Sequence, residues 1–175
     1  MAVMASVWRF CPFCGGELAA GPRSPHWHCS LCGLTHYRNP AVGVAVILME
    51  SNQVLLTCRS RGRYAGLWCV PCGYVEWDED VRRAAQREVK EETGLEIVVL
   101  DVCDVRSNFH DRDRQTVGIW FWGKRIGGEL KPGDDASDAR FFPLDALPPL
   151  AFPTDSAVLA DIRRGTLVAP TSGEH

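Results

Sequence analysis

The stretch from Gly73 to Leu95, GYVEWDEDVRRAAQREVKEETGL, decides the fold and carries seven carboxylates in 23 residues. A helix that begins after Asp80 as its N-cap turns by about 100° per residue and gathers apolar side chains on one side. This apolar stripe consists of Val81, Ala84, Ala85 and Val89. The basic and amide side chains lie on the opposite side, which is therefore the side expected to face solvent.

Three glutamates depart from the usual arrangement, in which an acidic run faces water. Glu88 and Glu92 fall within the apolar stripe, and Glu91 lies on its edge. All three lie toward the C-terminal end of the helix, where the helix dipole disfavours each negative charge by about 0.3–1 kcal/mol. A divalent cation bound by oxygen ligands removes this conflict, whereas Arg87 alone supplies too little charge. The spacing therefore predicts a metal site in which Arg87 orients the carboxylates.

The same stretch resembles the motif of the Nudix hydrolases, G-x(5)-E-x(7)-R-E-U-x-E-E-x-G-U, where U is an aliphatic residue. The fixed positions are all met, by Gly73, Glu79, Arg87, Glu88, Val89, Glu91, Glu92, Gly94 and Leu95. The resemblance implies an α/β fold, the Nudix α/β/α sandwich with a mixed sheet. It also implies an enzyme that hydrolyses a nucleoside diphosphate linked to another group.

The resemblance also assigns catalytic and metal-binding roles to individual residues. Glu88 and Glu92 are implied as principal ligands of Mg²⁺ or Mn²⁺, and Glu91 as a ligand or a water-positioning group. Arg87 is implied as their orienter, and the backbone carbonyl of Cys72 as a further ligand. A diphosphate brings its own negative charge, so attack by water requires that cations neutralise its oxygens.

Two C-x-x-C pairs precede this element, in the segments CPFCG and CSLCG. Their thiols belong to Cys11, Cys14, Cys29 and Cys32. Four thiolates are typical of a structural Zn²⁺ site, whereas a redox dithiol would need one pair rather than two. The neighbouring His26, His28 and His36 are not needed as ligands, because four cysteines complete the shell. The other cysteines are expected to be buried small side chains: Cys58, Cys69, Cys72 and Cys103.

A zinc ribbon directly before a Nudix domain resembles the zinc-containing branch of the family, which includes NADH, ADP-ribose and FAD pyrophosphatases. The junction CGLTHYRNPAVGVAVIL carries this likeness. The NADH-cleaving members have a SQPWPFPxS stretch after the motif, where this chain has RSNFHDRDRQTVG. The likeness therefore implies ADP-ribose or FAD as the substrate, with AMP released, and leaves NADH as the alternative.

The chain is expected to form a zinc ribbon over residues 1–38, a Nudix domain over 39–169 and a flexible tail over 170–175. The apolar run AVGVAVILME predicts a strand buried on both faces, paired with QVLLTCR through a turn at Ser51 and Asn52. Further strands are predicted within LWCVPCGYVE, LEIVVLDVCDV, QTVGIWFWGKRI and ARFFPL. A last helix is predicted from about Thr154 to Arg164, with Thr154 or Asp155 as its cap and Gly165 after its end.

Charged residues near the motif are candidates for substrate contacts. Guanidinium groups suit phosphate oxygens, although ordinary surface arginines are an equal alternative. The arginines concerned are Arg59, Arg61 and Arg63. The resemblance to Nudix enzymes implies an extra carboxylate, as base or ligand, in the loop GDDASDARFF with Asp134, Asp135 and Asp138, of which Asp138 is the candidate, against the alternative of a charged loop tip.

Aromatic residues after the motif are candidates for stacking a base. Trp120 and Trp122 lie at strand spacing on one face and favour a place in the core. Phe109 is therefore the better candidate for contact with an adenine or flavin ring.

The formal net charge of −3 disfavours general adhesion to nucleic acid or to an anionic membrane. No apolar run reaches the roughly 18 residues of a membrane span, so a cytoplasmic protein with reduced cysteines is expected. The expected partner is a small-molecule nucleotide, and a homodimer is compatible with this organisation.

The rival class is a non-catalytic module that senses nucleotides or binds nucleic acid through the zinc ribbon. Such a module would no longer need the hydrolytic carboxylates, all of which are present. The basic residues of the ribbon, Arg9, Arg23 and Arg38, are too few for strong phosphate binding. The sequence therefore favours the enzyme.

Overall fold

The structure is a computed structural model that describes residues 8–20, 26–111, 114–133 and 135–170. The chain forms two compact units, Met1–Pro40 and Ala41–His175. Apart from Pro170, the tail predicted at residues 170–175 lies outside the described residues. None of the helices in the described part of the chain has the length and hydrophobicity needed to cross a membrane.

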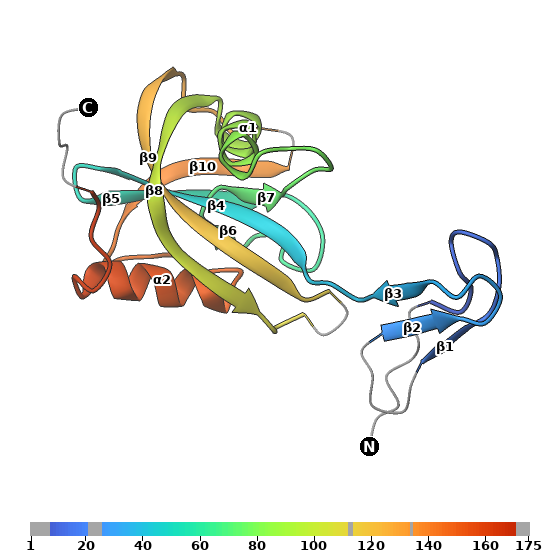
Figure 1. Cartoon of the computed structure of the whole chain (residues 1–175). Helices are drawn as coiled ribbons and strands as arrows, with labels where there is room; N and C mark the ends of the chain where they lie inside the picture. The colour runs from blue at the N-terminus through green and yellow to red at the C-terminus, as the bar shows by residue number, and fades with distance from the viewer. Residues whose placement is uncertain (1–7, 21–25, 112–113, 134, 171–175) are drawn as a thin grey trace. The chain divides into compact units, whose positions relative to one another are not determined.

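The first unit carries short antiparallel strands in the order β1-β2-β3 (Figure 1). Their bounds are Leu18–Ala20, His26–Cys29 and Thr35–Tyr37. Cys11 and Cys14 precede β1, Cys29 is the last residue of β2, and Cys32 lies in the turn between β2 and β3. In the first turn, the backbone amide of Cys11 donates to the carbonyl of Gly16, and the amide of Gly15 donates to the carbonyl of Cys11. In the second turn, the amide of Gly33 donates to the carbonyl of Cys29.

The second unit is built on a mixed sheet with strands in the order β10-β5-β4-β9-β8, with β6 paired to β5 and β7 to β4. The strands are β4 (Ala41–Glu50), β5 (Gln53–Arg59), β6 (Trp68–Cys69), β7 (Cys72–Tyr74), β8 (Leu95–Asn108), β9 (Thr116–Gly128) and β10 (Ala136–Pro143). β4 and β9 run parallel, and the other pairs are antiparallel. The two helices are α1 (Val81–Thr93) and α2 (Pro153–Arg163).

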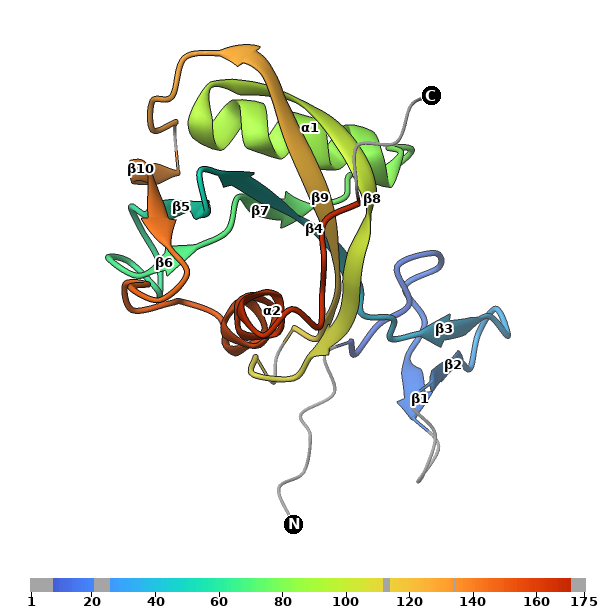
Figure 2. The ribbon, with the colours of Figure 1, turned by 90° about the vertical axis from the view of Figure 1, so that its left-hand side faces the viewer.

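The helices cover opposite faces of this sheet (Figure 2). Alternate residues of β4 divide between the two resulting cores. Val44, Val46 and Leu48 pack with Ala84, Ala85 and Val89 of α1, whereas Ala45 and Ile47 pack with Val158 and Leu159 of α2. A strand buried on both faces is what its unbroken apolar run predicts. The predicted α/β/α sandwich with a mixed sheet is confirmed.

The predicted hairpin between β4 and β5 is also confirmed. Ser51 and Asn52 have φ values of 48° and 62°, so both central residues of the turn are left-handed. Such a two-residue turn matches the twist of the strands that it joins.

The predicted cap of the last helix is wrong. The N-cap of α2 is Phe152, which makes no side-chain capping hydrogen bond, and Pro153 follows it at the start of the helix. Asp155 instead accepts hydrogen bonds from the backbone amide of Val70 at 3.3 Å and from Trp120 Nε1 at 3.2 Å. Its carboxylate is used for tertiary contacts, and it is therefore not available to cap the helix.

Candidate active site

Helix α1 begins and ends where the sequence predicts. Asp80 Oδ1 accepts hydrogen bonds from the backbone amides of Arg82 at 2.9 Å and Arg83 at 3.3 Å. Gly94 ends the helix in a left-handed conformation with φ 71°, which glycine adopts without steric cost. These two ends fix the helix, and with it the directions in which the side chains of Glu88, Glu91 and Glu92 project from its axis.

The three glutamates of α1 differ in exposure in the predicted order. Glu92 is buried with 8% of its surface exposed, Glu88 is partly buried and Glu91 is exposed. Burial raises the pKa of Glu92 to about 8 and raises the pKa of Glu88. Neither buried carboxylate has a positive charge sufficient to offset its lost hydration, which is the arrangement that favours a bound cation.

Glu92 is held against the β7 backbone. Its Oε2 accepts hydrogen bonds from the backbone amide of Cys72 at 3.1 Å and from Thr57 Oγ1 at 3.4 Å. The amide and the hydroxyl come from β7 and β5, so Glu92 joins both strands to the helix. Its position is fixed by the sheet as well as by α1.

Gly73 makes room for Glu88. A Cβ atom at position 73 would lie 2.0 Å from the Cδ and Oε1 atoms of Glu88. The motif glycine thus allows the carboxylate to lie directly against the backbone of β7. This contact brings Glu88 next to the peptide whose carbonyl belongs to Cys72.

Arg87 joins the carboxylates of the motif into one network. Its Nε and Nη2 donate to the two carboxylate oxygens of Glu79 at 2.8 and 2.9 Å, which lowers the pKa of Glu79 to about 2. Its Nη1 donates to Glu88 Oε1 at 2.8 Å and to Glu91 Oε2 at 3.1 Å, and Nη2 also reaches the carbonyl of Tyr74 at 3.1 Å. The side chain of Arg87 thereby fixes the rotamers of its acidic neighbours.

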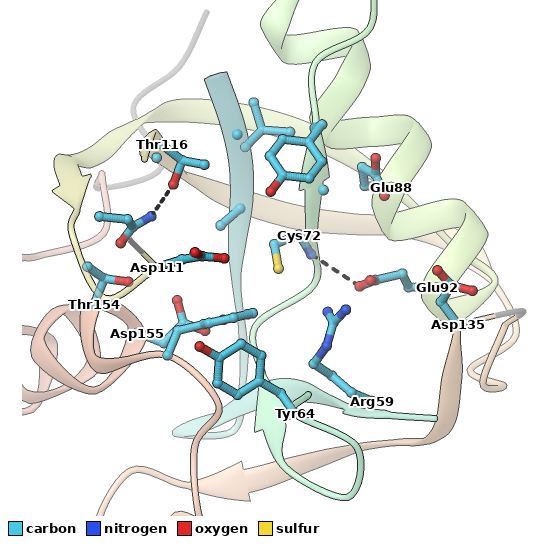
Figure 3. Close-up of a pocket in the computed structure, with 18 of the residues that line it drawn as sticks. Arg59, Tyr64, Cys72, Glu88, Glu92, Asp111, Thr116, Asp135, Thr154 and Asp155 are labelled. Atoms are coloured by element: carbon cyan, nitrogen blue, oxygen red, sulfur yellow. Dashed lines mark hydrogen bonds between the residues drawn. The ribbon is translucent and has the colours of Figure 1, made fainter. Parts of the chain in front are cut away.

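The glutamates of α1 line a cavity of about 730 Å³ in the second unit (Figure 3). Glu88, Glu91, Glu92 and Cys72 belong to its lining. Figure 3 shows Arg59 extending from β5 toward Cys72 and Glu92. The cavity therefore brings the carboxylates of α1 and the guanidinium of Arg59 into one site.

The predicted arginines divide between the cavity and the surface. Arg59 and Arg61 line the cavity, whereas Arg63 is not among its described lining residues and lies over the ring of Tyr64, 5.6 Å from its centroid. Arg61 forms an exposed ion pair with Asp135, which also lines the cavity.

Asp138 and Phe109 lie elsewhere in the structure. Asp138 pairs with Arg140 and is not among the described residues that line the cavity. The side chain of Phe109 is 68% exposed and also lies outside that lining, while the next residue, His110, is part of it. Trp120 and Trp122 are buried with 3% and 5% exposed, so their predicted place in the core is confirmed.

Several lining residues were not predicted from the sequence. Tyr64, His110 and Phe152 lie together in the cavity, and Asp155 contributes to its wall. Cys72 was expected to be buried but is only partly so because its side chain faces the cavity, whereas Cys58, Cys69 and Cys103 are buried as predicted. The positions that were not predicted, Tyr64, His110, Phe152 and Asp155, belong to loops and to the start of α2, where periodicity gives no signal.

The four cysteines of the first unit converge. Their Sγ atoms all lie within 4.8 Å of one another. Cys14 and Cys29 are 3.4 Å apart, and Cys11 and Cys32 are 3.8 Å apart, all as free thiols. A tetrahedral Zn²⁺ with bonds of about 2.3 Å places its sulfurs about 3.8 Å apart.

His36 lies beside this cluster as an outer neighbour, with Nε2 at 3.2 Å from Cys11 Sγ. The backbone amide of Cys32 lies 3.5 Å from Cys29 Sγ and lowers the pKa of Cys29, whereas the adjacent thiol of Cys29 raises the pKa of Cys14. Thiolates stabilised by such donors are the form that binds metal. The cluster therefore fits zinc without a histidine ligand.

Comparison with known proteins gives a consistent result. The family model described as NUDIX domain matches residues 38–162. ADP-ribose pyrophosphatase of Methanocaldococcus jannaschii is 45% identical over 118 residues, which make up 66% of this chain and 69% of that protein. NAD-capped RNA hydrolase NudC of Pseudomonas aeruginosa is 34% identical over 154 residues, or 85% of this chain and 54% of that protein.

The fold has a close structural relative. The crystal structure of a NUDIX hydrolase from Nitrosomonas europaea superposes with a TM-score of 0.78 and 28% identity, covering 90% of this chain and 94% of that one. The chain spans about two thirds of the archaeal pyrophosphatase but only about half of the NudC protein from Pseudomonas.

Proposed function

Because this chain belongs to the Nudix hydrolase family, whose reaction here is hydrolysis of a pyrophosphate linkage, we propose that its substrate is ADP-ribose or FAD and that cleavage releases AMP. The similarity to a protein named ADP-ribose pyrophosphatase supports this choice. The chain also lacks the SQPWPFPxS stretch of the NADH-cleaving branch. Both substrates carry a diphosphate between two larger groups.

The main support for this proposal is that acidic and basic side chains face the same cavity. Glu88 and Glu92 form one wall, and Arg59 reaches toward Glu92 from the other (Figure 3). Arg59 is partly buried and lines the cavity. A phosphate oxygen is a suitable acceptor for its guanidinium, because guanidinium groups bind phosphate with paired donors.

The oxygen ligands of α1 fit Mg²⁺ or Mn²⁺. The proposed ligands are carboxylate oxygens of Glu88, Glu91 and Glu92 and the carbonyl of Cys72. Hard divalent cations prefer such oxygens, and the close approach of Glu88 to the backbone at Gly73 brings carboxylate and peptide together. When bound, the cation neutralises phosphate oxygens and lowers the pKa of the attacking water.

The protein side chains hold this arrangement in place before the substrate enters. Arg87 orients Glu88 and Glu91 through the hydrogen bonds described above. Cys72 and Thr57 orient Glu92 through its Oε2. Arg59 binds and aligns the diphosphate from the opposite wall. Positioning of this kind supplies much of the rate enhancement of phosphoryl transfer.

The four-cysteine cluster is proposed to bind one structural Zn²⁺. Its ligands are Cys11, Cys14, Cys29 and Cys32. Because four protein sulfurs fill the tetrahedral shell, no position is left for a substrate or a reactive water. The zinc therefore stabilises the small unit and takes no part in hydrolysis.

A second candidate substrate is NADH or another compound with an NAD diphosphate. The similarity to NudC, a protein named as an NAD-capped RNA hydrolase, extends over 85% of this chain and favours this candidate. Its diphosphate would make the same contacts with Arg59 and the carboxylates. The two candidates differ in the group attached beyond the second phosphate.

A hydrolysis assay separates these candidates. The specificity constants for ADP-ribose, FAD and NADH are compared with Mg²⁺ and with Mn²⁺, and AMP is identified as a product. We expect ADP-ribose or FAD to have the highest value. A tenfold preference for NADH would overturn the proposed substrate while leaving pyrophosphate hydrolysis intact.

A further inference from the structure

An aromatic cluster lies in the cavity with the catalytic carboxylates. We propose that the rings of Tyr64, His110 and Phe152 form the subsite that binds the nucleobase of the substrate by stacking. This inference rests on the proposed function, because it assigns the base of the AMP portion to a particular part of the same cavity.

The three rings contact one another. The ring centroids of Tyr64 and Phe152 are 5.3 Å apart, and those of His110 and Phe152 are 5.6 Å apart. Tyr64 and His110 are separated by 6.3 Å, which completes the cluster. All three residues line the cavity and remain only partly buried. Ring surface is therefore present at the cavity wall and available for a planar group.

The cluster does not belong to the cores that stabilise the sandwich. Neither core includes any of its three rings among its buried or partly buried members. The rings come from the loop between β5 and β6, the loop between β8 and β9, and the start of α2. Segments distant in sequence thus converge on the cavity rather than on the interior.

The loop that carries Tyr64 is a tightly hydrogen-bonded turn. Gly62 and Gly66 flank Tyr64 with φ values of 80° and 81°, a conformation that favours glycine. Backbone hydrogen bonds from Gly66 to Arg59 and from Arg59 to Leu67 close the base of the loop. Tyr64 is consequently presented to the cavity by a constrained backbone.

Phe152 occupies a position where local helix stability favours another residue. An N-cap is preferentially Ser, Thr, Asp or Asn, because their side chains accept a hydrogen bond from the first helical turn. Phe152 makes no such bond. A departure from local preference is expected where function selects the residue. An aromatic ring at this N-cap is better explained by contact with a ligand than by helix stability.

Arg59 connects the cluster to the site of hydrolysis. Its guanidinium carbon lies 5.7 Å from the centroid of the Phe152 ring. Figure 3 shows Tyr64 near Arg59 and away from Glu88. A nucleotide whose base stacks on the cluster would therefore place its phosphates beside Arg59, between the guanidinium and the carboxylates of α1.

Binding of AMP and of ribose 5-phosphate in the presence of Mg²⁺ tests this subsite by calorimetry. Both compounds carry a ribose phosphate, and only AMP carries a base. Stacking of a base on an aromatic side chain corresponds to a change of about 5- to 150-fold in affinity. We expect Tyr64→Leu and Phe152→Leu to weaken AMP binding by such a factor and to leave ribose 5-phosphate binding within twofold of wild type.

Phe109→Leu is the matched comparison, because Phe109 is an exposed aromatic residue next to His110 but outside the cavity lining. We expect this variant to bind AMP as wild type does. A loss of AMP affinity confined to Phe109→Leu would overturn the proposal, as would unchanged AMP binding in both cluster variants. Equal losses for AMP and ribose 5-phosphate, or no AMP binding by the wild type, would also contradict it.

The binding measurements do not depend on turnover, so the subsite and the substrate can be tested separately. If AMP binds through the cluster but neither ADP-ribose nor FAD is hydrolysed, the substrate proposal fails and the base subsite stands. If hydrolysis proceeds while the cluster variants bind AMP normally, the subsite proposal fails alone. Melting temperatures of the three variants verify that each protein is folded during the titrations.

Discussion

The carboxylate of Glu92 accepts a hydrogen bond from the backbone amide of Cys72, with 3.1 Å between the amide nitrogen and Oε2. This bond joins the last turn of α1 to β7 and places a buried carboxylate at the wall of the cavity. Burial raises the pKa of Glu92 to about 8. Burial thus disfavours the charged form of Glu92 at the point where the motif predicts a cation, which would favour that form.

Replacement of Glu92 by glutamine tests the metal-ligand assignment. Glu92→Gln keeps the shape of the side chain but removes the charge that coordination requires. We expect a loss of about a thousandfold in turnover, which corresponds to roughly 4 kcal/mol of transition-state stabilisation. Without metal, the variant should melt at the same temperature as wild type or higher, because it relieves a burial penalty.

The control for this variant is Glu96→Gln. Glu96 forms an exposed pair with Lys90 and lies outside the described cavity lining, so its turnover should match wild type. Activity of Glu92→Gln above about a tenth of wild type, a cost below about 1.4 kcal/mol, would exclude Glu92 as a principal ligand.

The cysteine cluster predicts zinc in protein purified without added metal. Elemental analysis should find about one Zn²⁺ per chain, as four thiolates complete one shell. Cys14→Ser should lose this zinc and destabilise the small unit while some turnover remains. Cys103→Ala should retain the zinc, because Cys103 lies in the core of the second unit. Less than half an equivalent of zinc in the wild type would contradict the site.

Structural features that depend on residues close together in the sequence could be predicted from the sequence alone. The rotation of Glu92 into the buried side of α1 follows from helical periodicity, and the caps at Asp80 and Gly94 follow from local backbone requirements. The unbroken apolar run of β4 follows from its position between two helices. Each of these signals lies within one element, so a single sequence contains it.

Features that depend on tertiary convergence could not be predicted in the same way. Tyr64 and His110 come from two loops and Phe152 from the N-cap of α2, and no periodicity brings them together. The cap of α2 was assigned wrongly because the role of Asp155 depends on Val70 and Trp120. Capping preference is a local tendency, and these buried hydrogen bonds override it.

The contact between Gly73 and Glu88 predicts a steric effect on the site. In Gly73→Ala the new Cβ would lie 2.0 Å from the Glu88 carboxylate, so the side chain must move away from the β7 backbone. We expect at least a hundredfold loss of turnover, or about 2.7 kcal/mol. The comparison variant Gly165→Ala has open space around its Cβ but a φ of 73°, and Gly165 is not among the described residues that line the cavity, so this variant tests backbone strain alone.

Stability of Gly73→Ala separates displacement from unfolding. We expect its melting temperature to fall no further than that of Gly165→Ala, while its turnover falls much more. Wild-type turnover in Gly73→Ala would show that the position of Glu88 against the backbone is not needed for hydrolysis.

The last prediction concerns Asp155 and the pH dependence of stability in the metal-free protein. Burial raises the pKa of Asp155 from 3.8 to about 8 in the folded state. Between these values the folded protein holds a proton that the unfolded chain has released, so this contribution to stability is complete below about pH 4 and is lost as the pH rises through about 8. Asp155→Asn mimics the neutral acid at every pH. We therefore expect the unfolding free energy of wild type to fall more steeply between pH 5 and pH 8 than that of Asp155→Asn, measured by denaturant titration with chelator present.

Glu92 contributes in the same direction in both proteins, and exposed Asp145 supplies the control, since Asp145→Asn should keep the wild-type slope. Equal slopes in wild type and Asp155→Asn would mean that the buried carboxylate of Asp155 is already ionised at pH 5.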